Sequence, residues 1–281
     1  MALWIWRITL TAVCITLTLF YYRGRQAVPS EGKLRPLAFH AGLVILLLAL
    51  ASPLHYLAGQ YFSMRVAQHL LLIAWAPALL LAANPVPQLL AGLPAGWRKW
   101  LKSQALAQRP FLRHFSLFAA RGTAWILFVS TFWLWYDPTL HQATLIYPAL
   151  RYLEVSLLFG SALLYWWHIT AAYPHVHKPM APIARAAYTL VGAWPVKMVG
   201  LILMFNPGTV YLYPQTFQFS GLSITDYNIG SIIIWVLGGI VFTTTTTLLM
   251  RDWLKSEEDK PSLPVSTWSS EEVLAAPGYR K

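Results

Sequence analysis

Three polar side chains stand together at the head of a long apolar stretch, and they are the first residues here that could do chemistry. Arg65, Gln68 and His69 occupy positions i, i+3 and i+4 of the apolar segment 61–87, so a helix places them on one face. A guanidinium, an amide and an imidazole are costly to hold inside an apolar span, and such groups usually face a bundle interior or a wet cavity. We interpret this helix face as the first candidate for a functional site.

Further polar residues are expected at a similar depth on other segments. Arg151 and Glu154 are spaced i, i+3, which suits an ion pair within one helix. The two charges could simply neutralise each other, which would lower the cost of inserting this segment into the membrane. Alternatively, one of the two residues could also bind Asp226 or Asp137. We predict that spans three, five and seven are held together by a polar network, whose members are Arg65, Gln68, His69, Arg151, Glu154, Asp226 and Asp137.

Histidines and one methionine are the candidate metal ligands. Imidazole and thioether groups suit Cu(I). None of the candidates has a tight ligand spacing such as HxxxH, so the alternative is a set of hydrogen-bonded histidines near span ends. Haem would need His55 and His69 to face each other across two spans, and nothing further supports it. The candidate copper ligands are His69, His55, His141 and Met64.

The elements that position these residues are predicted to be membrane spans. The chain has 281 residues, of which 57% are hydrophobic and only 11% are charged, whereas charged residues approach about a quarter of a soluble domain. Long apolar runs then indicate an all-α, polytopic membrane helix bundle. A single cysteine, Cys14, excludes an internal disulfide framework and a CxxC redox or zinc site. We predict seven transmembrane helices, at about residues 3–22, 36–58, 61–87, 119–135, 149–169, 186–205 and 228–250.

The basic residues predict the orientation of the bundle. Seventeen of the 21 Lys and Arg lie in the tail and in the connections after spans one, three and five, counting Arg121 at the start of span four, and none lies in the other connections. The positive-inside rule therefore places the N-terminus outside and the C-terminus in the cytoplasm. The net charge of +11 follows from this topology and needs no nucleic-acid partner. Residues 1–255 are predicted to form the membrane domain and 256–281 an extended cytoplasmic tail.

Four basic residues remain inside the predicted spans. Arg7, Arg65 and Arg151 fall towards the outer leaflet, together with the candidate ligands. Lys197, two residues after Pro195, is the deepest charge, and the sequence leaves open whether it snorkels to the membrane surface or pairs with a polar group elsewhere.

The order of several short motifs resembles a known family. The motifs are Ala51-Ser52-Pro53-Leu54, Val66-Ala67-Gln68-His69, Ala76-Pro77, Asn84-Pro85, Trp135-x-Asp137-Pro138, Leu153-Glu154 and Asp226-Tyr227-Asn228-Ile229-Gly230. Their order and spacing, over about residues 36–250, resemble the CtaG-type assembly factors of caa-type cytochrome c oxidase. The resemblance implies a seven-span fold and a role in maturing the oxidase, with copper delivery to it as the implied chemistry.

The departures from the family pattern bear on copper. The family tends to have His-Met where this chain has Arg65-Val66, and a His-x-x-x-His pair where it has Arg151 and Val155. A guanidinium has no lone pair to offer a metal and repels a cation. The resemblance therefore implies the fold and the oxidase connection more strongly than it implies copper binding.

Together these observations predict a protein that is not an enzyme and that assists assembly or stabilisation of a haem–copper oxidase. Its expected partners are oxidase subunits and membrane lipid, and a link to copper insertion stays open. One alternative is a permanent accessory subunit of a respiratory complex without metal chemistry, and another is a copper transporter or chaperone. The missing imidazoles argue against the last of these.

Overall fold

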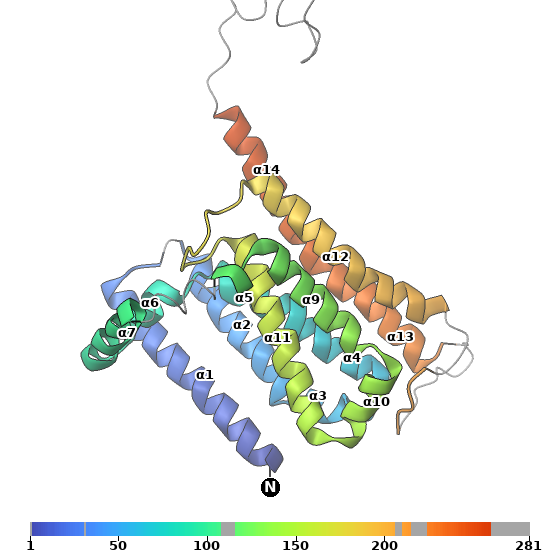
Figure 1. Ribbon diagram of the computed structural model, residues 1–281. Helices are drawn as coiled ribbons and strands as arrows, with labels where there is room; N and C mark the ends of the chain where they lie inside the picture. Colours follow the sequence, from blue (N-terminus) through green and yellow to red (C-terminus); the bar gives the residue numbers. More distant parts are fainter. Residues whose placement is uncertain (1, 31, 108–115, 206–209, 215–223, 260–281) are drawn as a thin grey trace, which may run out of the picture.

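The computed structural model describes residues 2–30, 32–107, 116–205, 210–214 and 224–259, and their regular structure is helical (Figure 1). Five helices lie where spans one, two, four, five and six are predicted: α1 (Ala2–Ala27), α2 (Leu34–Leu50), α9 (Arg121–Trp135), α11 (Pro148–Thr170) and α12 (Pro182–Phe205). Spans three and seven each contain a π-helical turn. The third comprises α4 (Phe62–Leu70), η1 (Leu71–Trp75) and α5 (Ala76–Ala82), and the seventh comprises α13 (Asp226–Ile233), η2 (Ile234–Gly238) and α14 (Gly239–Glu258).

Four of these helices are long and apolar enough to cross a membrane: Trp4–Ala27, Phe62–Ala82, Pro182–Phe205 and Asp226–Glu258. The chain is therefore a helical membrane protein, as predicted. Among the other three, α2 has 17 residues, α9 has 15, and α11 has 23 but carries two charges near its start. Seven spans and the orientation of the termini stay predictions.

The predicted second span is divided at Ser52-Pro53. Proline has no N–H to continue the hydrogen-bond ladder of α2, and the Ser52 hydroxyl accepts from the Leu54 N–H at 3.1 Å, starting the short helix α3 (Pro53–Leu57). This break turns the chain so that α3 packs against α4. It brings His55 beside the polar face of the third span.

The third span is shorter than predicted. Its helix ends at Ala82 because Asn84 adopts a left-handed φ of 46° and Pro85 follows it. The residues up to 87 instead begin α6 (Val86–Gly92), which precedes the basic helix α7 (Ala95–Ala107).

The α4–η1–α5 segment runs through the centre of the bundle (Figure 1). One side of it joins a core cluster with α9, α11, α12 and α14 through Val66, Leu70 and Ile73, while Leu72 and Ala76 join a second cluster with α1 and α2. Because apolar neighbours surround this segment, the polar face of α4 lies inside protein and away from lipid.

Helix α1 stands at the edge of the bundle and meets α6 by close backbone approach. A side-chain carbon added to Gly24 would lie 1.7 Å from the Gln88 carbonyl oxygen, and one added to Gly92 would lie 1.9 Å from that of Phe20. Glycines at a crossing allow two helix backbones to approach this closely. This contact fixes the C-terminal half of α1.

The last helix enters the predicted tail. The tail is predicted to start at residue 256, but α14 continues to Glu258, so residues 256–258 are helical where extended chain is predicted. The Trp253 indole donates to the Glu257 carboxylate at 3.1 Å, an i, i+4 contact that favours helix here. The predicted tail from 260 to 281 lies outside the described residues.

Candidate functional site

A buried ion pair between α4 and α11 forms the centre of the candidate site. The Arg65 Nη2 atom lies 2.5 Å from Glu154 Oε2, and neither side chain is exposed at all. The same Nη2 also donates to the hydroxyl of Thr144 in α10 (Pro138–Ile146). A buried charge is tolerated only when paired and hydrogen-bonded, so these three groups depend on one another.

His69 approaches the same carboxylate from one turn further along α4. Its Nε2 atom lies 3.2 Å from Glu154 Oε1, and the edge of its ring meets the Tyr136 ring with a centroid distance of 5.6 Å. The i, i+4 spacing of Arg65 and His69 thus directs a guanidinium and an imidazole to the two oxygens of one carboxylate.

The ion pair predicted between Arg151 and Glu154 is not formed. The Arg151 guanidinium turns away from Glu154 and donates to the His55 carbonyl oxygen in α3. A side-chain carbon on Gly59 would lie 2.6 Å from Arg151 Nη1, so Gly59 leaves the space that the guanidinium fills. Glu154 faces the bundle interior, where Arg65 enters from the neighbouring helix and neutralises it.

The Gln68 side chain forms hydrogen bonds at the break that ends α2. Its Nε2 atom donates to the Ala49 carbonyl oxygen at 2.6 Å and lies 2.9 Å from His55 Nδ1. In a continuous helix the Ala49 carbonyl would accept from residue 53, but that residue is a proline and has no N–H. The amide therefore satisfies an acceptor that Pro53 leaves open, and it fixes α3 against α4.

Asp226 joins the seventh span to the third at a separate point. The side chain is 2% exposed, and its carboxylate accepts from the backbone N–H of Phe62 at 2.6 Å and of Ser63 at 3.3 Å. A carboxylate is favourable at a helix N-terminus, where backbone N–H groups lack partners. Among the described salt bridges none links Asp226 to Arg65, so this contact is a second and independent tie.

Asp137 lies outside the network, and its predicted membership is wrong. Its side chain is exposed and accepts from the Thr139 and Leu140 N–H groups at 3.0 and 3.1 Å, which caps the start of α10. The Asp-Pro corner forms an N-cap, because a short carboxylate ahead of Pro138 is well placed to bond the first free N–H groups of the helix.

The segment 210–214 covers α10, and the sequence interpretation missed its residues. The Tyr211 hydroxyl donates to the Tyr136 carbonyl oxygen at 2.6 Å, and the Leu212 N–H donates to Gln142 Oε1 at 3.0 Å. The Tyr213 hydroxyl lies 2.6 Å from His141 Nε2. The only signal in the sequence is the polar, aromatic composition of the connection between α12 and α13, which does not indicate what it covers.

His141 is held as a neutral imidazole between two elements. Its Nδ1 atom lies 2.9 Å from the Trp135 carbonyl oxygen, which can only accept, so Nδ1 carries the proton and Nε2 accepts from Tyr213. Helix α10 has nine residues, too few to span a membrane. Burial, and then the Arg65 cation, lower the pKa of His141 from its ordinary value of 6.5 to about 3, while Glu154 opposes this shift.

We expect acid to destabilise the protein through His141. Its pKa is lower when folded (about 3) than when unfolded (about 6.5), so its contribution to stability is complete above pH 6.5 and is lost as the pH falls towards 3. The slope approaches about 1.4 kcal/mol per pH unit between these values. His141→Asn, whose amide can still donate to the Trp135 carbonyl, should unfold less steeply with acid when thermal stability in detergent is followed from pH 7 to 4. Parallel curves for the two proteins would contradict this assignment.

The candidate copper ligands form no metal-binding cluster among the described residues. His55 Nδ1 lies beside the Gln68 amide, both nitrogens of His141 have hydrogen-bond partners, and Met64 is half-buried. The described part of the chain contains no cluster of three or more His, Cys, Asp or Glu suited to a metal ion. His69 Nδ1 has no hydrogen-bond partner, but the other nitrogen of this ring faces the Glu154 carboxylate that Arg65 already neutralises.

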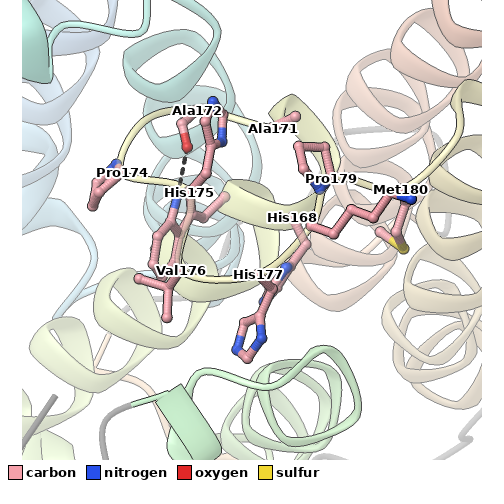
Figure 2. A pocket seen from close by; sticks show the side chains of 11 residues that line it. His168, Ala171, Ala172, Pro174, His175, Val176, His177, Pro179 and Met180 are labelled. Carbon is pink, nitrogen blue, oxygen red and sulfur yellow. Dashed lines mark hydrogen bonds between the residues drawn. The ribbon is translucent and has the colours of Figure 1, made fainter. Parts of the chain in front are cut away.

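A second group of histidines lies at the connection between α11 and α12, around a small pocket (Figure 2). His168 Nε2 lies 2.8 Å from the Ala119 carbonyl oxygen, and His177 Nε2 lies 2.9 Å from that of Ser116. The cavity volume is about 20 Å³, room for about one water molecule. These histidines tie the connection to the chain ahead of α9, which is a structural role.

Comparison with known proteins gives one match. The model of the cytochrome c oxidase caa3 assembly factor family (Caa3_CtaG) matches residues 18–256, a range that includes every residue of the candidate site. No curated protein and no solved structure matches the chain.

Proposed function

The chain belongs to the cytochrome c oxidase caa3 assembly factor family, and on that premise we propose that it assists oxidase assembly as a scaffold, without holding copper in its polar core. In this proposal the protein is not an enzyme, crosses the bacterial cytoplasmic membrane seven times with its N-terminus outside, and contacts oxidase subunits. The observation that supports a scaffold is the Arg65–Glu154 ion pair at 2.5 Å in the centre of the bundle.

The ion pair lies where two potential metal ligands meet. Glu154 and His69 are the two potential ligands that converge, and the Arg65 guanidinium already neutralises the carboxylate between them. Five N–H donors and no lone pair make a guanidinium a permanent cation that cannot ligate. The family's copper connection, if it extends to this protein, then acts through the partner or through another site.

Copper analysis tests this part of the proposal. We expect purified protein to bind copper well below one equivalent, and His69→Ala to leave that content unchanged, because the imidazole faces an internal ion pair. Metal content by mass spectrometry and competition with a Cu(I) chelator would measure both. A tight, stoichiometric complex that His69→Ala abolishes would instead favour the copper chaperone or transporter.

Affinity purification from native membranes tests the oxidase role. A strain lacking the protein should contain less assembled oxidase, measured by its haem absorbance, and the tagged protein should retain oxidase subunits in less than equimolar amount. An equimolar, permanent complex with the mature oxidase would identify an accessory subunit. Unchanged oxidase in the deletion strain would refute both.

A further inference from the structure

Lys197 is a cation within a membrane-spanning helix that the polar network does not use. It lies in α12, half-buried, with its Nζ atom 5.1 Å from the centre of the Trp235 ring in η2. A side-chain carbon on Gly239 would lie 3.7 Å from Nζ. The ammonium therefore occupies the seam between α12 and the π-helical turn, and π-helical turns within α-helices frequently mark functional sites.

The seam lies near the middle of the predicted seventh span, residues 228–250. Trp235 and Gly239 follow Asp226, the first residue of α13, by about 13 and 20 Å along the axis at 1.5 Å per residue, in a hydrocarbon core about 30 Å thick. Helical side chains lean towards the N-terminus of their helix. Lys197 thus leans away from Phe205, the nearer end of α12, so snorkelling to that end is disfavoured.

The Lys197 ammonium has no acidic partner in this seam among the described residues. Among the described salt bridges none includes Lys197, and the Trp235 indole Nε1 is buried with no hydrogen-bond partner. The cation–π contact stabilises the ammonium only in part. A carboxylate placed here would accept from the ammonium and neutralise a charge that is costly in lipid.

The surface beside the seam faces outward. Trp194, one turn before Lys197, is 62% exposed, and Val236, next to Trp235, is 52% exposed. Both side chains are apolar, as expected of a surface that meets lipid or another membrane helix. A helix lying along this surface would bring its side chains to the ammonium.

The carboxylate cannot come from a second copy of the described chain. Glu154 is paired with Arg65, Asp226 caps α4, and Asp137 caps α10. The remaining described acids stand in the last turns of α14 or just beyond it: Asp252, Glu257, Glu258 and Asp259. A lipid phosphate stays at the membrane surface, about 15 Å from the bilayer centre. Among the described residues, a second copy therefore offers no unengaged acid at this depth, which favours a different protein as the source of the carboxylate.

We propose that the seam between α12 and η2 is the docking site for a transmembrane helix of another protein that carries an Asp or Glu near the bilayer centre. This inference rests on the proposed function, which identifies that protein as an oxidase subunit. The partner carboxylate accepts from the Lys197 ammonium, and its helix covers Trp194 and Val236.

Removing the charge tests the docking. Lys197→Leu should accumulate in membranes like the wild type but retain about tenfold less partner on purification, the scale expected for one interhelical polar contact. Lys197→Arg should retain the partner. Lys255→Leu, which removes an exposed lysine from the end of α14, is the matched control and should change nothing. Equal partner retention in Lys197→Leu and Lys255→Leu would overturn the inference.

Cross-linking tests it without removing the lysine. A photoreactive amino acid at Val236 should form an adduct with a membrane segment that contains Asp or Glu, and the same probe at Ile126 on α9, 56% exposed, should not. Exchanging the charges, with Lys197→Asp and the partner acid changed to Lys, should restore the complex. An adduct with lipid alone, with a second copy, or with a segment lacking a carboxylate would refute the docking site.

The deletion strain distinguishes a wrong docking site from a wrong proposed function. If deletion lowers oxidase while Lys197→Leu does not, only the docking site is wrong. If deletion leaves the oxidase unchanged, the proposed function itself fails.

Discussion

Arg65→Ala is expected to destabilise the protein by about 3–5 kcal/mol, because it leaves the buried Glu154 carboxylate without its cation. His69 is the only other described group paired with that carboxylate, and the hydroxyl of Thr144 would lose its donor as well. The midpoint of thermal unfolding in detergent, and the amount of folded protein in membranes, would measure the loss.

The control is Arg98→Ala in the exposed helix α7. It removes the same side chain from a solvated position, and surface substitutions of this kind are usually within about 0.5 kcal/mol of the wild type. Equally mild effects of the two substitutions would count against a buried network that holds the bundle together.

Glu154→Leu should be as severe as Arg65→Ala, about 3–5 kcal/mol, because it leaves a buried guanidinium unpaired. Adding Arg65→Leu to it should then recover most of the stability, since replacing a buried ion pair by apolar residues of similar volume is often neutral or stabilising. Thermal unfolding of the two single variants and the double variant forms a double-mutant cycle. Destabilisation in the double variant equal to the sum of the two singles would show that the charges do not act as a pair.

The double variant also separates stability from function. If the double variant folds and still supports oxidase assembly, the ion pair serves only the packing of spans three and five. Loss of oxidase in a folded double variant would show that the charged centre has a further role in the partner complex.

The two polar ties have different structural consequences. The Arg65–Glu154 pair fixes α4 to α11 within the bundle, and Asp226 fixes the N-terminus of α4 to α13. Gln68 adds a third tie, to the end of α2. Spans two, five and seven are therefore each tied to the third span, and a rotation of the third span would disturb all three ties at once.

The sequence by itself determined the helical segments and the inward face of the third span. Apolar runs and an i, i+3, i+4 spacing depend only on residue types and helix period, so they predict which residues share a face before any packing is known. The motif order likewise indicated the family that the match over residues 18–256 shows.

Only the tertiary structure decided which groups meet. Spacing favoured Arg151 as the partner of Glu154, yet Arg65 from another helix takes that place, and Arg151 bonds a carbonyl of α3. The tertiary structure also decided that Asp137 caps α10 and that Lys197 contacts the Trp235 ring. The physical reason is that helix period fixes the direction of a side chain relative to its own axis, whereas its partner depends on how neighbouring helices are rotated and shifted against each other.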